Sequence, residues 1–267
     1  MSLQKPARII FIGAPGVGKG TQTARLQNRF PQLSSISSGD LLRDNSALID
    51  ISNLGVKVAS TLSAGKLVPD SLILNLIIQE FQRRGWSLPS IDIPPMSFSS
   101  TAISENIDSF VERPSSSENT VKSLRDNNDP SSSFILDGFP RSVDQAQKLN
   151  KLIPINFVVS LKTPASKIIE RIKGRWIHAP SGRTYNTSFK KPKVEGIDDV
   201  TGERLIKRED DDLETWENRL KQFEKTSEPL LSYYAQKGLL WEVEGNSSDE
   251  ITPKLFLEVA KRFGVTV

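Results

Sequence analysis

Short apolar runs alternate along the chain with longer segments whose apolar residues recur at helical spacing. Buried strands are predicted at 9–12, 33–36, 134–137, 155–161 and 239–243. Helices are predicted between and after them, over 21–30, 54–64, 72–84, 144–153, 165–173, 213–236 and a final segment reaching residue 262. Because strands alternate with helices throughout, the pattern predicts an α/β fold with a parallel sheet covered by helices on both faces.

Two stretches depart from this alternation. Residues 87–133, here called the insertion, hold 14 Ser and 5 Pro and show little periodicity. Such a composition buries too little apolar surface to offset the entropy of ordering, so we expect a disordered surface spacer. Residues 174–212, here called the polar unit, are rich in Gly, Pro and charge, and the short alternation at 183–189 predicts a small β-structure.

Composition excludes several kinds of chemistry. The 267 residues include no cysteine and a single histidine, which removes disulfides, thiolate zinc sites and cysteine nucleophiles. The formal net charge is +3, and the arginines are spread along the chain, so a nucleic-acid partner is not indicated. No apolar run approaches the roughly 20 residues that a membrane helix needs. The composition fits a soluble protein that acts on small anionic substrates.

A glycine-rich loop, Gly13–Thr21, directly follows the first apolar run and reads GAPGVGKGT. Its spacing is the P-loop pattern, in which backbone N–H groups cradle phosphate oxygens and Lys19 reaches the β- and γ-phosphates. Gly20 replaces the usual Ser or Thr after the lysine, and Thr21 follows it. The alternative is a glycine-rich turn between strand and helix with no ligand.

Two further polar turns carry candidate groups. Asp137 ends a buried run, as expected for the acid that holds the water shell of Mg²⁺ beside a P-loop, and Gly138 and Arg141 follow it. Ser38 opens another helix that carries Arg43. Taken alone, that pair is as well explained by a helix cap and a solvated arginine.

Five ordered motifs, at 13–21, 37–43, 65–70, 136–141 and 171–211, together resemble the long form of the adenylate kinases. The resemblance covers nearly the whole chain except the insertion. Within the family, the stretch 31–40 is most similar to the fungal mitochondrial GTP:AMP phosphotransferase type.

The resemblance implies a P-loop NTPase fold of three layers, α/β/α, with a helical NMP-binding segment and a small β lid. The core would comprise 1–37, 71–86, 134–173 and 213–267, the NMP-binding segment 38–70, and the lid 174–212. The implied reaction is reversible transfer of the γ-phosphoryl group of Mg-ATP or Mg-GTP to AMP.

The same resemblance implies a role for each matching residue. The donor would be bound by Gly16, Gly18, Lys19, Gly20, Thr21, Arg171 and Arg175, with Arg171 stacked on its base. AMP would be bound by Ser38, Arg43, Val68, Gly138, Arg141 and Gln145. The transferring phosphoryl group would meet Lys19, Arg141, Arg175, Arg208 and Arg219, oriented by Asp210 and Asp211. Mg²⁺ would be the cofactor, held by Asp137 through water.

Some members of this family carry four zinc-binding cysteines in the lid, and the matching positions here are His178, Ser181, Asp198 and Thr201. Ser and Thr are poor zinc ligands. We therefore expect a hydrogen-bonded network in place of the metal, a structural role for the single histidine, and no stoichiometric zinc.

A P-loop GTPase that acts as a regulatory switch is the competing function. It needs an Asn-Lys-x-Asp motif, and Asn150-Lys151 is followed by Leu152 and Ile153. For the kinase we expect ATP or GTP and AMP as partners, no nucleic acid, no membrane and a monomer. The resemblance points to the mitochondrial matrix, whereas the short segment before the first strand gives no cleavable presequence and favours the cytoplasm.

Overall fold

The structure is a computed structural model that describes residues 1–42, 70–86, 129–207 and 212–266. Several predictions fall outside these residues: the helix at 54–64, most of the insertion, and the site residues Arg43, Val68, Arg208, Asp210 and Asp211.

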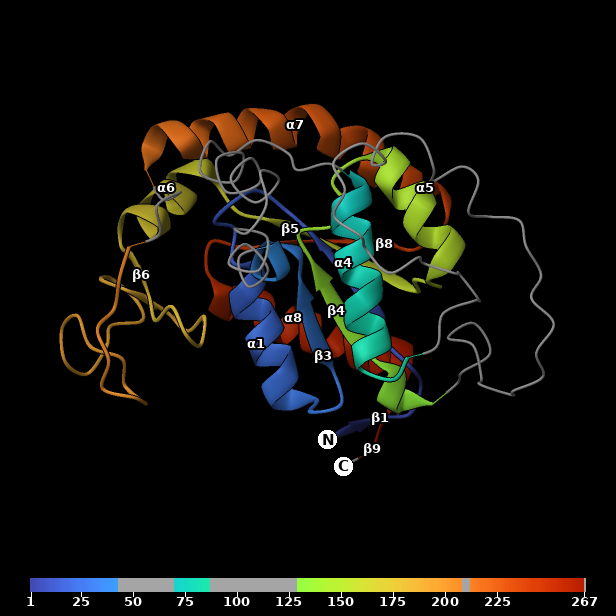
Figure 1. Ribbon diagram of the computed structural model, residues 1–267, viewed down its shortest axis with the longest axis horizontal. Helices are drawn as coiled ribbons and strands as arrows, with labels where there is room; N and C mark the ends of the chain where they lie inside the picture. Colours follow the sequence, from blue (N-terminus) through green and yellow to red (C-terminus); the bar gives the residue numbers. More distant parts are fainter. Residues whose placement is uncertain (43–69, 87–128, 208–211, 267) are drawn as a thin grey trace, which may run out of the picture.

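Helices and strands alternate in the order that the apolar pattern predicts (Figure 1). The strands are β1 Ser2–Leu3, β2 Arg8–Ile12, β3 Ser34–Ser37, β4 Phe134–Asp137, β5 Phe157–Lys162, β6 Arg175–Ile177, β7 Thr184–Asn186, β8 Leu240–Glu244 and β9 Val265–Thr266. The helices are α1 Lys19–Arg29, α4 Asp70–Arg83, α5 Val143–Leu152, α6 Ala165–Lys173, α7 Leu213–Gln236 and α8 Ser248–Phe263, with a 3-10 turn, η2, at Pro130–Ser132. The predicted elements among these agree within two residues at nearly every end.

The central sheet has five parallel strands in the order β3-β4-β2-β5-β8. The glycine-rich loop leaves the middle strand, β2, and Asp137 ends its neighbour β4. Because all five strands run the same way, the segments that follow them meet at one edge of the sheet. This topology brings the glycine-rich loop, Asp137 and the turn at Ser38 together.

Alternate residues of β2 belong to two separate apolar clusters, which makes the fold a three-layer sandwich. Ile10 and Ile12 join a cluster completed by helices α4, α5 and α7. Ile9 and Phe11 join a second cluster completed by α1, α6 and α8. Since successive side chains of a strand point to opposite faces, one helical layer covers each face. The predicted three-layer P-loop architecture is confirmed.

The two ends of the chain pair with each other, which the apolar pattern did not predict. β1 and β9 form a two-stranded antiparallel sheet, with Ser2 opposite Thr266 and Leu3 opposite Val265. The labels N and C lie next to each other in Figure 1. The side chain of Leu3 is buried in the second cluster, so this pair closes the lower end of the core.

The last residues of the insertion are ordered, in contrast to the expected disorder over 87–133. Asp129 caps the turn η2 by accepting a hydrogen bond from Ser131 N at 2.8 Å. Ser133 is fully buried, and its Oγ accepts a hydrogen bond from Ala7 N at 2.9 Å. A serine-rich sequence is ordered here because its hydroxyls satisfy backbone groups beside β2 and β4.

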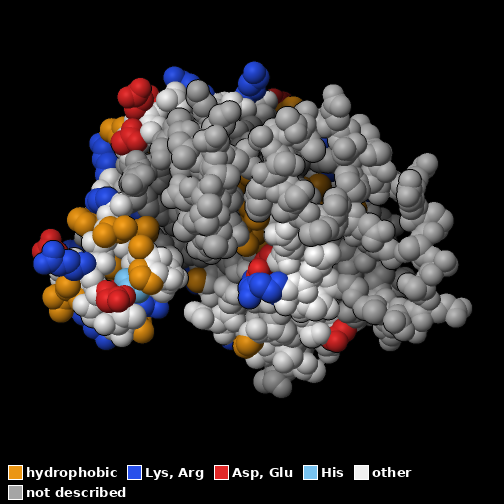
Figure 2. Space-filling view, viewed as in Figure 1, with side chains coloured by type: hydrophobic (Ala, Val, Ile, Leu, Met, Phe, Trp, Pro, Cys, Tyr) orange, Lys and Arg blue, Asp and Glu red, His pale blue; other side chains and the backbone are white. Residues whose placement is uncertain are grey.

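The polar unit contains the predicted β-structure. β6 and β7 pair antiparallel, and single bridges join Ile177 to Ile206 and Ile197 to Arg204. Figure 2 shows apolar and charged side chains gathered on this unit, at the left of the view. Its exposed large apolar residues are Phe189, Val194, Val200 and Ile206.

Across the described ranges, every helix is too short or too polar to cross a membrane.

Candidate active site

A cavity of about 490 Å³ opens where the parallel strands end. Its walls come from the glycine-rich loop, from the turn after β4, from α6 and α7, and from the polar unit. The residues named from the sequence that line it are Gly16, Gly18, Lys19, Gly20, Thr21, Asp137, Gly138, Arg141, Arg171, Arg175 and Arg219. Residues far apart in the chain therefore share one site, and most of its charged members are cations.

The glycine-rich loop has a backbone that only glycine adopts easily. Gly16 and Gly18 have φ angles of +83° and +108°, in the left-handed region. A Cβ on Gly16 would also lie 2.8 Å from side-chain carbons of Ile168 and Ile172. α1 begins directly after Gly18, and its first turn lines the cavity. The first N–H groups of a helix lack intrahelical acceptors, so this turn can bind an anion.

Lys19 lies across the loop that it follows. Its Nζ donates hydrogen bonds to the carbonyl of Gly13 at 2.7 Å and to that of Ala14 at 3.1 Å. Burial of the ammonium group lowers the pKa of Lys19 to about 8, and the positive charges of nearby arginines act in the same direction. Asp137 opposes this shift. A bound polyanion would favour the charged form of this lysine.

Three arginines from different elements surround Lys19. Arg141, Arg175 and Arg219 each act on its pKa through their charge, and all three line the cavity. They come from the turn before α5, from β6 and from α7. Such an array of fixed cations can neutralise the charge that spreads over a transferring phosphoryl group.

The turn after β4 connects Arg141 to the remaining AMP candidates. The guanidinium Nε of Arg141 donates to the carbonyl of Gly138 at 2.7 Å, and its backbone N donates to Oε1 of Gln145 at 2.5 Å. Gly138 has a φ of +81°, and a Cβ there would lie 2.6 Å from Oγ of Ser38. Ser38 and Gln145 are buried just behind the cavity wall, and Ser38 Oγ has no hydrogen-bond partner among the described residues.

Arg171 links two loops. Its Nη1 donates to the carbonyl of Val17 at 2.8 Å, and its Nη2 donates to the carbonyl of Asn246 at 2.9 Å. These bonds hold the guanidinium plane between the glycine-rich loop and the turn that precedes α8. Burial lowers the pKa of Arg171 from its ordinary value.

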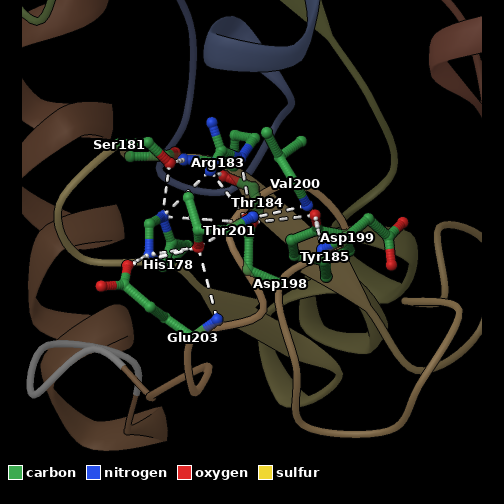
Figure 3. Close-up of polar contacts among 11 residues, drawn as sticks. His178, Ser181, Arg183, Thr184, Tyr185, Asp198, Asp199, Val200, Thr201 and Glu203 are labelled. Carbon is green, nitrogen blue, oxygen red and sulfur yellow. Dashed lines mark hydrogen bonds and ion pairs between the residues drawn. The ribbon is translucent and has the colours of Figure 1, made fainter.

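The polar unit is organised around Asp198, as Figure 3 shows. The buried carboxylate of Asp198 accepts two hydrogen bonds from Arg183, at 2.9 and 2.7 Å, and one from the hydroxyl of Tyr185 at 2.9 Å. It also accepts from backbone N–H groups, including that of Thr201 at 2.8 Å. The paired guanidinium of Arg183 holds the pKa of Asp198 far below its usual range.

His178 joins the same network and is buried. Its Nδ1 lies 2.7 Å from Oγ of Ser181 and 3.3 Å from Nη2 of Arg183, whereas its Nε2 contacts the carboxylate of Glu203 (Figure 3). Arginine can only donate and a carboxylate can only accept, so the contacts fit a ring protonated at Nε2. The four positions that the resemblance aligned with a zinc site thus form a hydrogen-bonded network. Within the described ranges no group of three or more His, Asp or Glu is placed to bind a metal.

Among the cavity residues that were not predicted from the sequence, two lie close to the glycine-rich loop. Trp216, in the first turn of α7, donates its indole N–H to the carbonyl of Pro15 at 3.0 Å. Ser248, at the start of α8, has its Oγ 3.4 Å from where a Cβ of Gly18 would stand. Both lie more than 190 positions along the chain from the glycine-rich loop, and no local pattern signals such a contact.

Comparison with known proteins agrees with this geometry. The family model for adenylate kinase matches residues 11–88 and 116–239, more than half of the chain. The chain belongs to the adenylate kinase family. The gap in the match, between residues 88 and 116, lies within the insertion.

Relatives match over nearly the full length. A mitochondrial GTP:AMP phosphotransferase of Saccharomyces cerevisiae is 40% identical, covering 98% of this chain and 96% of the relative. A protein of the same description from Drosophila melanogaster is 36% identical, covering 94% of each chain. An adenylate kinase of Chloroherpeton thalassium is 37% identical, covering 93% of this chain and 95% of the relative.

Family membership decides between the function classes that the sequence left open. The chain is a phosphotransferase of the nucleoside monophosphate kinase class, and the predicted family and enzyme class are confirmed. The comparisons give no support to the regulatory GTPase, the competing hypothesis.

Proposed function

We propose that this kinase transfers the γ-phosphoryl group of Mg-ATP or Mg-GTP reversibly to AMP. The observation that carries the proposal is the convergence of Lys19, Arg141, Arg175 and Arg219 on one cavity beside a glycine-rich loop. The relatives are named GTP:AMP phosphotransferase and adenylate kinase, which supports AMP as the acceptor and leaves both triphosphates as donors.

Phosphoryl transfer needs little covalent help from the protein. Charge spreads over three equatorial oxygens in the transition state, so positioning and cationic stabilisation supply most of the acceleration. In this proposal the glycine-rich loop and Lys19 bind the donor phosphates, and Arg171 flanks the donor base. The transferring group meets Arg141, Arg175 and Arg219, together with Arg208, which lies outside the described residues.

We place AMP at the turn after β4. Ser38 offers a buried hydroxyl without a partner among the described residues, and Arg141 offers a guanidinium that lines the cavity. Gln145 fixes the backbone of Arg141. Arg43 and Val68, which the family pattern also assigns to AMP, lie outside the described residues.

The residues fit a magnesium ion held mainly by water and phosphate. Mg²⁺ prefers oxygen ligands and keeps several waters, and the carboxylate of Asp137 lines the cavity close enough to Lys19 to act on its charge. Gly20 offers no hydroxyl at the position where P-loop proteins usually supply a ligand, and Thr21 follows. When bound, Mg²⁺ would supply positive charge that neutralises part of the charge of the donor phosphates.

The polar unit is proposed to act as a lid. It carries Arg175, and it contributes Tyr185 and Phe189 to the cavity wall, so its movement would change access of water. Excluding water protects the γ-phosphate from hydrolysis while both nucleotides are bound.

The proposed core comprises 1–37, 71–86, 134–173 and 213–267, with 38–70 as the AMP-binding segment.

We also propose that the chain works as a monomer in the mitochondrial matrix. Two of the relatives described above are named mitochondrial, which supports the organelle. Imaging of the full chain with a C-terminal tag, scored against matrix and cytoplasmic markers, tests the location.

A coupled assay tests the reaction. With AMP as acceptor and ATP, GTP, CTP or UTP as donor, we expect Mg²⁺-dependent formation of ADP with at least one purine donor. The ratio of kcat/KM for GTP and ATP defines the donor preference. The proposal fails if no donor produces ADP, or if UMP, CMP or GMP replaces AMP with higher kcat/KM.

A further inference from the structure

Side chains bind the backbone carbonyl groups of the glycine-rich loop. Four of its backbone carbonyls accept hydrogen bonds from side chains: Lys19 Nζ binds those of Gly13 and Ala14, Arg171 that of Val17, and Trp216 that of Pro15. Lys19 is part of the loop itself. Arg171 and Trp216 are therefore the two contacts among these that tie the loop to other elements.

These two contacts come from the helices on either side of the polar unit. Arg171 lies in the last turn of α6, which ends at Lys173, and Trp216 lies in the first turn of α7, which begins at Leu213. Both chain connections of the polar unit therefore enter helices that are hydrogen-bonded to the glycine-rich loop. A shift of either helix end would therefore displace the loop.

The contact of Trp216 is specific in both packing and polarity. The residue is 4% exposed and belongs to the apolar cluster that includes Val17, Ile168 and Ile172. A buried indole N–H needs an acceptor, and the carbonyl of Pro15 supplies it. Phenylalanine could fill most of the same space but could not make this bond.

Trp216 also shares a helix face with Arg219. Residues three positions apart in a helix are neighbours on its surface, and both side chains line the cavity. The indole therefore sets the position of the loop relative to the helix that carries Arg219. We propose that Trp216 is a positioning residue, which fixes the spacing between the loop that binds the donor phosphates and the arginine that meets the transferring group. This inference rests on the proposed function of the site.

Replacing Trp216 tests the proposal. In Trp216→Phe we expect kcat/KM for the triphosphate to fall about tenfold, the effect of losing one aligned hydrogen bond, while the KM for AMP stays within twofold. The matched control is Trp241→Phe, in which a tryptophan of β8 that packs near Phe157 receives the same change. Its kinetic constants are expected to remain those of the parent chain.

Two further measurements separate positioning from packing. If Trp216 acts through Arg219, the double variant Trp216→Phe/Arg219→Lys loses less kcat/KM than the product of the two single losses. Thermal unfolding of both tryptophan variants reports on packing alone. The proposal is overturned if Trp216→Phe keeps the kcat/KM of the parent chain, or if its KM for AMP rises as much as its KM for the donor. It is also overturned if the loss of kcat/KM in the double variant equals the product of the losses in Trp216→Phe and Arg219→Lys.

Binding of inorganic tripolyphosphate distinguishes this inference from the reaction itself. Calorimetry on the full chain measures that binding without any turnover, so it remains informative if no donor yields ADP. We expect Trp216→Phe to bind tripolyphosphate about tenfold more weakly than the parent chain and than Trp241→Phe. Equal affinity in all three chains would contradict the positioning role.

Discussion

Lys19 illustrates how the charge of one residue depends on the rest of the site. Its ammonium group closes the glycine-rich loop from inside, yet burial and three neighbouring arginines lower its pKa to about 8. A bound triphosphate would favour the charged form and raise this pKa again. At a pH between the pKa of Lys19 in the free protein and its pKa in the complex, triphosphate binding must be accompanied by proton uptake.

We therefore predict that proton uptake accompanies triphosphate binding at alkaline pH. Calorimetry in buffers of different ionisation enthalpy should find little uptake near pH 7 and a rise toward one proton near pH 9. Lys19→Arg is the control, because arginine stays charged throughout and should abolish the uptake. Binding without proton uptake at any pH in this range would contradict the lowered pKa.

Arg141 combines a structural and a proposed catalytic role. Its Nε is engaged by the carbonyl of Gly138, while the side chain lines the cavity and its charge reaches Lys19. The backbone bond to Gln145 does not depend on the side chain. Removing the guanidinium should therefore affect turnover much more than folding.

For Arg141→Ala we expect kcat/KM to fall by about 10²–10³, with a far-UV circular dichroism spectrum like that of the parent chain. The kcat/KM of Arg141→Lys should lie between those of Arg141→Ala and the parent chain, because lysine keeps the charge but cannot bind an anion bidentately. Arg83→Ala serves as control, since the side chain of Arg83 is 74% exposed and pairs with Glu80 outside the cavity. An unchanged rate in Arg141→Ala would remove this residue from the site.

At the scale of elements, the polar unit depends on one buried carboxylate. Asp198 accepts hydrogen bonds from Arg183, from Tyr185 and from the backbone of Thr201. Because its pKa is depressed in the folded chain, the stability that it contributes is present above the ordinary pKa of an aspartate and is lost only as the pH falls below it. From about pH 5 upward, the stability that Asp198 contributes does not depend on pH.

Asp198→Asn tests that dependence. The amide keeps the shape but turns one acceptor into a donor facing Arg183, so the β6–β7 unit should open more often. We expect amide hydrogen exchange over 175–206 to become about tenfold faster while the central sheet keeps its protection. Asp199→Asn is the neighbouring control, because Asp199 is exposed and its carboxylate accepts a hydrogen bond from the backbone N of Lys193. Unchanged protection in Asp198→Asn would show that the apolar and backbone contacts hold the unit alone.

At the scale of the whole molecule, the chain ends close the core far from the cavity. α8 begins at Ser248 in the cavity wall and ends at Phe263, so its 16 residues span about 24 Å. Beyond it, β9 pairs with β1, and Leu3 is buried in the apolar cluster that lies beneath β2. The cavity and the pair of terminal strands thus lie at opposite ends of α8.

Leu3→Ala should lower the stability of the chain without changing substrate binding. We expect the free energy of unfolding to fall by about 2–3 kcal/mol in equilibrium urea titrations, with both KM values unchanged. Ser2→Ala, at the exposed position beside it, should leave the stability as it is. A change in either KM in Leu3→Ala would show that the ends of the chain influence the site.

Much of the fold could be predicted because its signals are local. The apolar run before Gly13 predicts a buried strand, and helical spacing predicts α7 from Leu213 to Gln236 at the residues observed. β1 and β9 escaped prediction since two-residue strands have no periodicity and depend on the chain ends meeting. The ordered end of the insertion, at Ser133, depends on a hydrogen bond from the backbone N of Ala7, 126 positions earlier in the chain.

The same division holds for the site. From the sequence alone we could identify the glycine-rich loop, Lys19 and Asp137, because their chemistry depends on spacing within a few residues. The folded chain was needed to reveal the lowered pKa of Lys19 and the contact between Trp216 and Pro15. Those properties arise from groups that are distant along the chain and meet only when the parallel strands bring their carboxyl ends to one edge of the sheet.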